Sequence, residues 1–178
     1  MSSKILSAAV IGLDAEIVEV EADTGGGELG NFTVVGLPDA AVQESRERVR
    51  SAIKNSGFDF PKLKVTVNLA PADLKKHGPS YDLAIAMSIL IATKKVISKQ
   101  KLDETIFLGE LALNGDLRPV NGVLSIAMKA KNKNITTLFV PAVNAKEAKL
   151  VKELKIIPID SLADLINHLE NKKQINEI

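Results

Sequence analysis

The sequence predicts an α/β fold built on a mixed sheet. In the first half, apolar and charged residues alternate, which is typical of antiparallel strands with one face in water. In the second half, short β-branched segments alternate with amphipathic ones, as in strands joined by helical crossovers. The 178 residues, of which 46% are apolar, suffice for one domain with a sizeable core.

Composition excludes several classes of function. The 23 basic and 22 acidic residues leave a net charge of +1, so any contact with nucleic acid must use a local patch. Cysteine is absent, which excludes disulfides and thiolate chemistry and favours a reducing cytoplasm. His77 and His168 are the only histidines, and no set of residues resembles a metal site. No apolar run approaches the ~20 residues that cross a bilayer.

The N-terminal segments predict strands. KILSAAVIGL resembles the apolar part of a signal peptide, but it continues into DAEIVEVEAD, whose alternation predicts strand. Val18, Val20 and Ala22 share one face of that strand. A glycine-rich turn, TGGGELG, leads to the β-branched NFTVVGL, and a hairpin is the simple interpretation. A phosphate cradle is the alternative, although both common glycine-loop spacings are absent.

Residues 38–57 give the clearest helix signal. Pro38 suits the first turn, Asp39 lies near the positive end, and Gly57 is a stop signal. The apolar stripe is Val42, Val49, Ala52 and Ile53. The outer face carries a basic stripe of Arg46, Arg50 and Lys54. This stripe is either a solvated face tempered by nearby glutamates or a contact for phosphate, such as DNA.

The later segments are assigned in order. KLKVTVNLAP alternates as a strand, and a loop then leads to a helix, about residues 79–94, that is apolar on nearly all sides. Residues 105–122 predict a hairpin whose Asn114-Gly115 pair makes a tight two-residue turn. Helices are expected at about 123–131, 144–154 and 161–170, and strands at 137–141 and 155–159. Residues 1–170 form the predicted domain, and the polar residues 171–178 a frayed tail or linker.

Three long stretches carry a family resemblance: NFTVVGLPDAAVQESRERVRSAIKNSGF, VTVNLAPADLKKHGPSYDLAIA and FLGELALNGDLRPVNGVL. Together they resemble the N-terminal, ChlI-type domain of the ComM/YifB group of magnesium-chelatase-like AAA+ ATPases, over about residues 7–169. That domain in turn resembles the proteolytic domain of Lon protease. The resemblance implies a Lon-protease-like fold with a mixed sheet, βαβ crossovers and packed helices.

The Lon resemblance assigns Ser80 to the position of a nucleophile. Lon proteases carry the catalytic serine in K-D-G-P-S-A-G, which is similar to KKHGPSYDL here, although bulky Tyr81 replaces a small residue. Their lysine base follows a G-G-L-K turn, which is similar to NGVL, so Leu124 stands in place of the lysine. An isobutyl side chain takes up no proton, and the resemblance therefore implies a site without its base.

A few other residues are candidates for the base. Helical geometry directs Lys129 and Lys131 away from the position of Leu124. Lys75 and Lys76 are expected to be exposed, with pKa values near ~10 that make poor bases. His77, three residues before Ser80, is a better candidate because a histidine ordinarily has a pKa nearer neutrality than a lysine, but it would need an orienting carboxylate. The structural alternative for Ser80 is a first-turn serine whose hydroxyl satisfies free backbone amides.

The resemblance favours a non-catalytic interaction or assembly domain beside an AAA+ module of the same protein, associated with DNA processing in competence. It implies ATP and Mg only for that module, because this chain contains no G-x-x-x-x-G-K-[ST] loop and needs no cofactor of its own. It also implies a hexameric full-length protein with DNA as a partner, and a cytoplasmic location without a membrane. The alternatives are a degenerate serine peptidase that uses Ser80 with an unidentified base, and a small-molecule binding domain at the glycine loop.

Overall fold

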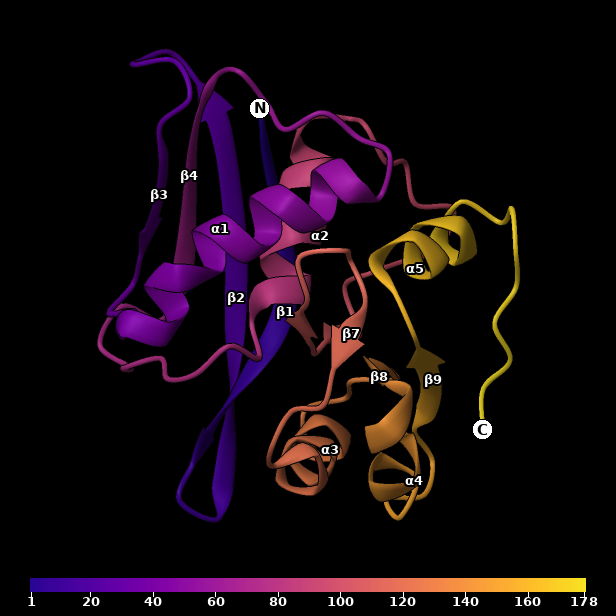
Figure 1. The fold of residues 1–178 in the computed structure, drawn as a ribbon. Coiled ribbons are helices and arrows are strands. Elements are labelled where there is room, and N and C mark those ends of the chain that lie inside the picture. The colour runs from indigo at the N-terminus through magenta and orange to yellow at the C-terminus, as the bar shows by residue number, and fades with distance from the viewer.

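The computed structural model describes residues 1–178 and contains a mixed seven-stranded sheet, a two-stranded sheet and five α-helices (Figure 1). The strand order of the large sheet is β3-β4-β2-β1-β5-β8-β9. Strands β1, β2 and β4 pair antiparallel, whereas β5, β8 and β9 pair parallel. The predicted fold class, with an antiparallel first half and parallel later strands, is confirmed.

The antiparallel half forms around one long hairpin. β1 (Ser2–Ile11) pairs with β2 (Asp14–Gly25) along its whole length, and β4 (Lys64–Ala70) pairs with the other edge of β2. Val18, Val20 and Ala22 are buried on one face of β2, as the alternation predicts. Because apolar residues on β4 alternate in the same way, the two strands bury their apolar faces together.

The predicted hairpin between β2 and β3 is wrong. β3 (Phe32–Val35) is a strand, but it pairs parallel with β4 at the edge of the sheet. Both edges of β2 are already occupied, one by β1 and the other by β4, so no edge remains for β3. The glycine-rich segment after β2 therefore carries the chain past β4.

The parallel half contains two crossovers. The first runs from β5 (Thr105–Phe107) through α3 (Val123–Asn132) to β8 (Thr137–Pro141), and the second runs from β8 to β9 (Lys155–Ile159). α5 (Leu162–Leu169) follows β9. The helix predicted at 144–154 is much shorter. It consists of a 3-10 turn, η1 (Ala142–Asn144), and one helical turn, α4 (Ala145–Ala148). The chain then turns toward β9, and Glu153 adopts a positive φ of 75° that no helix accommodates.

A small hairpin lies apart from the large sheet. β6 (Glu110–Leu111) pairs with β7 (Leu117–Arg118), so the predicted hairpin is present but covers fewer residues than expected. Its turn is not the predicted two-residue type. The Ala112 N–H donates to the Asp116 carbonyl at 2.9 Å, which leaves a three-residue loop in which only Gly115 has a positive φ, of 94°.

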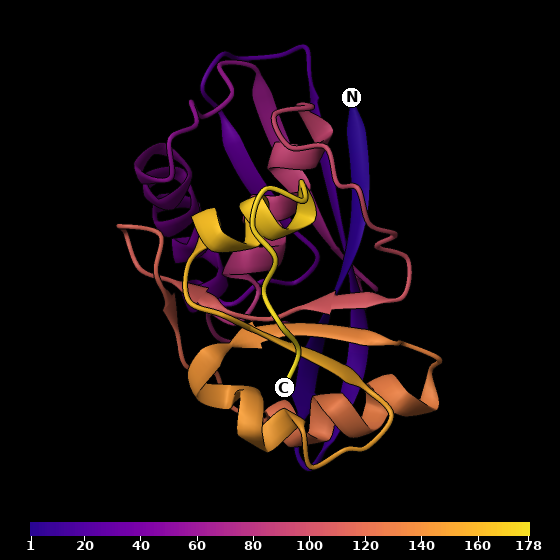
Figure 2. The same cartoon turned by 90° about the vertical axis from the view of Figure 1, so that its right-hand side faces the viewer.

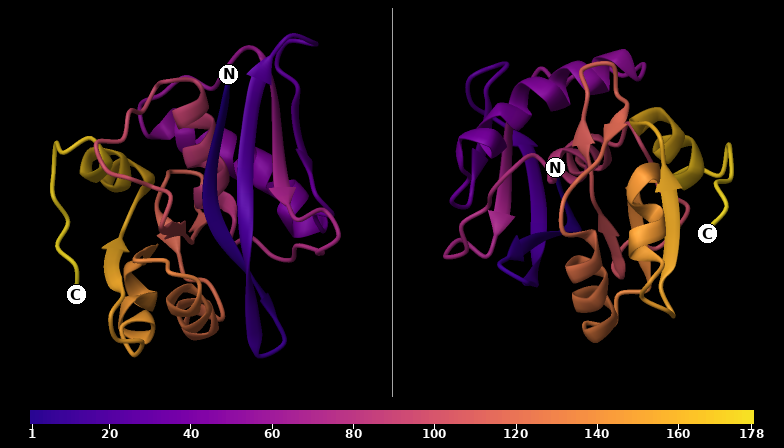
Figure 3. Two further views of the ribbon diagram at one scale, coloured as in Figure 1. Left: turned by 180° about the vertical axis from the view of Figure 1, so that it is seen from behind. Right: turned by 60° about the horizontal axis from the view of Figure 1, so that its bottom comes forward.

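Helices cover both faces of the sheet and create two cores. α1 (Ala40–Asn55), α2 (Asp82–Ala92) and α5 enclose the first core, and α3 and α4 the second. The parallel strands alternate between them, so that Phe139 enters the first core and Leu138 the second. Figure 2 shows α5 on one side of β8 and β9, with α3 and α4 on the other. Seen from behind, the upper parts of β1 to β4 carry no helix (Figure 3).

Residues 171–178 contain no helix or strand but contact the domain. The Ile175 N–H donates to His168 Nδ1 at 3.0 Å, and the Ile178 N–H donates to the Ile156 carbonyl at 3.1 Å. The Ile175 side chain packs against the first core. These residues therefore lie along α5 and β9. None of the helices in the structure has the length and apolar character that spanning a membrane requires.

Candidate functional site

Ser80 lies in a pocket of about 250 Å³. Four segments form its wall: the loop before α2, the end of β1, β6, and the loop that precedes α3. Its polar side chains are His77, Ser80, Glu110 and Asn121. Val10 of β1 and Val120 supply the apolar surface. The position that the Lon resemblance assigns to a nucleophile is thus a half-buried serine in a small pocket of mixed polar and apolar lining.

The prediction that Ser80 caps α2 is wrong. The helix begins at Asp82, and its N-cap residue is Tyr81, with no side-chain hydrogen bond to the first turn. Backbone carbonyls satisfy the first amides instead, because the Asp82 N–H donates to Pro79 and the Leu83 N–H to Gly109. The Ser80 hydroxyl forms no hydrogen bond within the protein, so it is available to a molecule in the pocket.

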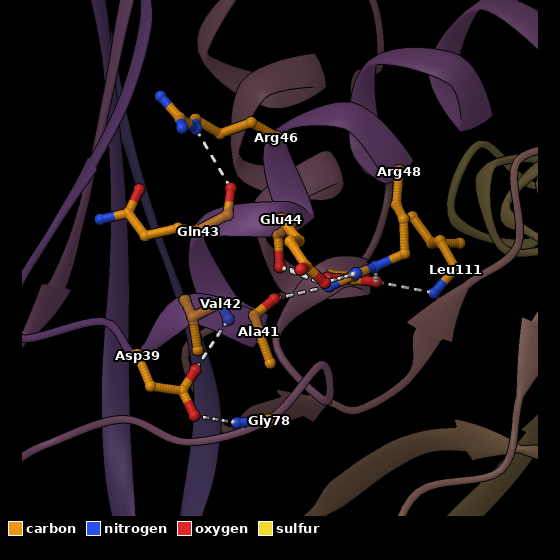
Figure 4. Close-up of polar contacts among 11 residues, drawn as sticks. Asp39, Ala41, Val42, Gln43, Glu44, Arg46, Arg48, Gly78 and Leu111 are labelled. Atoms are coloured by element: carbon orange, nitrogen blue, oxygen red, sulfur yellow. Dashed lines mark hydrogen bonds and ion pairs between the residues drawn. The ribbon is translucent and has the colours of Figure 1, made fainter.

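His77 has the carboxylate partner that the sequence did not reveal. Its Nδ1 lies 3.4 Å from Oδ2 of Asp39, and no hydrogen bond joins His77 to Ser80. Asp39 also accepts the N–H of Val42 at 2.8 Å and that of Gly78 at 3.2 Å (Figure 4). Partial burial raises the pKa of Asp39, but these two donors and His77 together hold it below its usual range. Asp39 therefore caps α1 and orients the loop that carries Ser80.

No lysine lines this pocket. Leu124 is the second residue of α3, with 36% of its surface exposed, and its N–H donates to Glu147 Oε1 at 3.0 Å. Lys129 pairs with Glu16 at 2.9 Å, and Lys131 pairs with Glu153 at 3.3 Å. Neither lysine reaches the pocket, in agreement with the helical geometry.

Lys76 is buried, which corrects the prediction that it is exposed like Lys75. Its Nζ donates to the carbonyl of Pro71, and burial lowers its pKa against a smaller opposing effect of Asp73. The Lys76 backbone explains the burial, because it exchanges hydrogen bonds of 3.0 Å with Leu37 and Asp39 and so draws the loop against the domain. Lys76 holds this loop but does not line the pocket.

An ion pair behind the pocket was not predicted. Arg48 Nε lies 2.6 Å from Asp82 Oδ2, and Arg48 Nη2 lies 3.1 Å from Oδ1. Asp82 also accepts the Ser45 hydroxyl and, at 3.1 Å, the Leu111 N–H (Figure 4). Burial raises the pKa of Asp82, and these contacts oppose that rise. The sequence does contain a feature that could have predicted this ion pair: Asp82 is the single carboxylate in the apolar run YDLAIAMSIL, and a buried carboxylate requires a partner.

The basic stripe on α1 lies beside β3, away from the residues that line the pocket. Arg46 donates to the carbonyls of Gln43 at 3.1 Å and Phe32 at 3.4 Å. The Arg50 guanidinium lies 4.4 Å from the ring centre of Phe60. Lys54 has no hydrogen-bond or ion-pair partner. Two of the three cations thus contact the fold itself, and DNA contact by this stripe stays a prediction.

Comparison with known proteins places this geometry in a family. Residues 18–144 match the family described as subunit ChlI of Mg-chelatase. The chain is 39% identical to competence protein ComM of Haemophilus influenzae and 43% identical to YifB of Escherichia coli, over 96% and 92% of its length. It is 27% identical to Lon protease 1 of Myxococcus xanthus, over 86% of its length and 20% of that protease.

The chain spans about a third of the length of ComM and YifB. The similarity to Lon protease 1 extends over most of the chain, consistent with the Lon-like fold. Since the family match covers more than two thirds of the residues, the chain belongs to the ChlI family of Mg-chelatase subunits, together with its relatives ComM and YifB.

Proposed function

We propose that this chain is a non-catalytic, Lon-protease-like interaction and assembly domain of a ComM/YifB-type protein. The observation that carries the proposal is the Ser80 pocket, which keeps the serine but contains no lysine in its wall. Leu124, at the position equivalent to the lysine, offers neither a proton acceptor nor a side chain in the pocket. A Lon-type dyad requires a lysine with a lowered pKa that reaches the serine hydroxyl.

The proposal includes a motor domain in the same protein. The ComM and YifB relatives are about three times as long as this chain, which leaves room for an AAA+ ATPase domain with bound ATP and Mg. This chain contains no phosphate-binding loop, so those ligands are assigned to the other domain. Residues 171–178 would then lead toward it. The name of the relative, competence protein ComM, supports a role in competence. The proposal adds DNA as a partner and the cytoplasm as the location.

Self-association tests the assembly role. AAA+ domains act as rings, so the full-length protein is expected to form a hexamer with ATP, whereas this chain alone is expected to remain smaller. Sedimentation or light scattering on both proteins, with and without ATP, measures this directly. A full-length protein that stays monomeric with ATP would contradict the proposal.

A second candidate is a degenerate serine peptidase, and the pair of His77 and Asp39 favours it. In that reaction the Ser80 oxygen attacks a carbonyl carbon, His77 accepts the hydroxyl proton, and the leaving group departs with that proton. Water then hydrolyses the acyl-serine bond. A fluorophosphonate probe tests it: labelling that is absent in Ser80→Ala and at least ten-fold slower in His77→Gln would support the peptidase. An unlabelled wild-type protein would exclude a reactive Ser80.

A further inference from the structure

Positive charge is concentrated in one segment of this nearly neutral chain. Residues 129–155 contain seven lysines and only two glutamates, although the whole chain has a net charge of +1. The segment runs from the middle of α3 through β8 and α4 to β9. α3 and α4 lie next to each other at the same end of the molecule (Figure 1, and Figure 3 from below). The segment that carries these lysines therefore lies at one end of the molecule.

This region is hollowed in two neighbouring places. One hollow, of about 250 Å³, is lined by Lys129 and Lys133, with Asp14 as its one acidic residue. A second, of about 420 Å³, is lined by Lys131, Lys152 and Leu150 among others. Met128 and Asn132 line both hollows, so the two are neighbours on α3. We define the lysine surface as two groups of residues. Those that line the hollows are Met128, Lys129, Lys131, Asn132, Lys133, Leu150 and Lys152, and the exposed Lys146 and Lys149 of the α4 segment lie outside them.

Most of these cations have no partner in the protein. Lys129 and Lys131 form ion pairs with Glu16 and Glu153. The other four form neither an ion pair nor a side-chain hydrogen bond, and all are exposed: Lys133, Lys146, Lys149 and Lys152. They differ in this from Arg46 and Arg50 of α1, which contact the fold. The cations most available to an outside anion thus lie on α3 and around α4.

We infer that the lysine surface binds the phosphate backbone of nucleic acid, independently of sequence. Unpaired lysines at the end of α3 and in and after α4 suit a long partner that carries charge at regular intervals, and each contact releases counterions. The surface holds no arginine and no exposed aromatic ring, which are the groups that read or stack on bases. The inference rests on the proposed role in a DNA-handling protein, and it assigns the contact to a definite site.

A membrane surface fits these residues less well. A helix that inserts into anionic lipid needs an apolar face that is free of the protein core. The apolar face of α3, which includes Ile126 and Ala127, is buried in the second core, and α4 has only one turn. The exposed apolar side chains that line the two hollows are Leu13, Met128 and Leu150, and they lie beside lysines and not on one free helix face.

Fluorescence anisotropy with a labelled 30-nucleotide strand and the matching duplex, from 50 to 200 mM salt, tests the inference. The test variant carries Lys133→Gln, Lys149→Gln and Lys152→Gln. The control carries Lys94→Gln, Lys99→Gln and Lys101→Gln, which removes equal charge from exposed sites elsewhere. We expect the test variant to bind at least ten-fold more weakly at 50 mM salt, with a salt slope shallower by about 2 to 3. The control should stay within two-fold of wild type.

Three results would overturn the inference: no binding by the wild-type chain, equal losses in the test and control variants, or a loss only in an Arg46, Arg50 and Lys54 glutamine variant. Binding to anionic vesicles without binding to either oligonucleotide would identify a lipid partner instead. Circular dichroism melts of each variant ensure that lost binding is not lost folding. The sizing experiment does not depend on this surface, so failure here leaves the assembly role standing, and the reverse also holds.

Discussion

Arg48 of α1 contacts both carboxylate oxygens of Asp82, the first residue of α2, at 2.6 and 3.1 Å. Asp82 is fully buried, and 18% of the Arg48 side chain is exposed. The same carboxylate accepts the Leu111 N–H, so one ion pair joins α1, α2 and β6 behind the Ser80 pocket. This pair is structural, because neither residue lines the pocket.

Removal of Asp82 should therefore cost stability. We expect Asp82→Ala to lower the free energy of unfolding by about 3 kcal/mol or more, since it leaves the Arg48 charge and the Leu111 amide without their partner. Glu44→Ala is the control, because Glu44 is exposed and lies 3.7 Å from Arg48; its expected cost is below about 0.5 kcal/mol. Urea denaturation followed by circular dichroism measures both. Equal losses of stability in the two variants would contradict a larger stabilising role for the buried ion pair than for the exposed one.

Acid should weaken the folded state through His168. Burial lowers the pKa of His168, with a further contribution from Lys155, and its Nδ1 accepts the Ile175 N–H. The pKa of His168 in the folded state lies below the unfolded value of about 6.5. Neutral His168 therefore makes its full contribution to the free energy of unfolding above pH 6.5, and this contribution is lost as the pH falls through the folded pKa. Urea denaturation of wild type and His168→Gln between pH 8 and 5 checks this. The wild type should lose more stability on acidification, and parallel curves would contradict it.

Gly36 should not tolerate a side chain. It has a φ of +102°, and an added Cβ would overlap the Leu69 carbonyl of β4. We expect Gly36→Ala to cost about 2 kcal/mol or more, because the strand pair would have to separate. Gly26 offers a matched control in the loop before β3, since its φ is not positive and a Cβ added there would meet no neighbouring atom. Gly26→Ala should change stability by less than about 0.5 kcal/mol, and thermal melts distinguish the two.

Arg50 should contribute more to folding than Lys54, its neighbour on the α1 stripe. The guanidinium lies over the Phe60 ring, so Arg50→Ala should cost about 1 kcal/mol, most of it from cation–π and packing contacts. Lys54→Ala should have an effect within about 0.5 kcal/mol, because Lys54 has no partner. Chemical denaturation of the two variants measures the difference. A larger loss of stability in Lys54→Ala than in Arg50→Ala would contradict the stabilising role assigned to the contact between Arg50 and Phe60.

Local sequence patterns predicted where helices and strands form better than they predicted which strands pair with each other. The alternation in EIVEVEA and KVTVNLA gave β2 and β4, and the signals at Asp39 and Gly57 gave α1. The place of β3 could not be read in this way, since strand order depends on which edges distant strands have already filled. The length of α4 was missed for a related reason, because the chain must turn early to bring β9 beside β8.

The candidate site was predicted in part. The sequence resemblance located Ser80 and Leu124, and the structure puts Ser80 in a pocket that no lysine lines. The role of Asp39 was not predicted, because residues 39 and 77 meet only through the pairing of Pro38 with Lys76. Burial of Lys76 follows from the same pairing. Contacts of this kind depend on the tertiary fold, and no local pattern encodes them.

The central claim, that the Ser80 site has lost its catalysis, is tested most directly by peptide hydrolysis. The measurement compares the full-length protein with its Ser80→Ala variant, using a fluorogenic casein or peptide substrate in the presence of ATP. The account predicts equal background rates, because no lysine reaches the serine. A rate at least ten-fold higher in the wild type, abolished by Ser80→Ala, would contradict it and identify a peptidase.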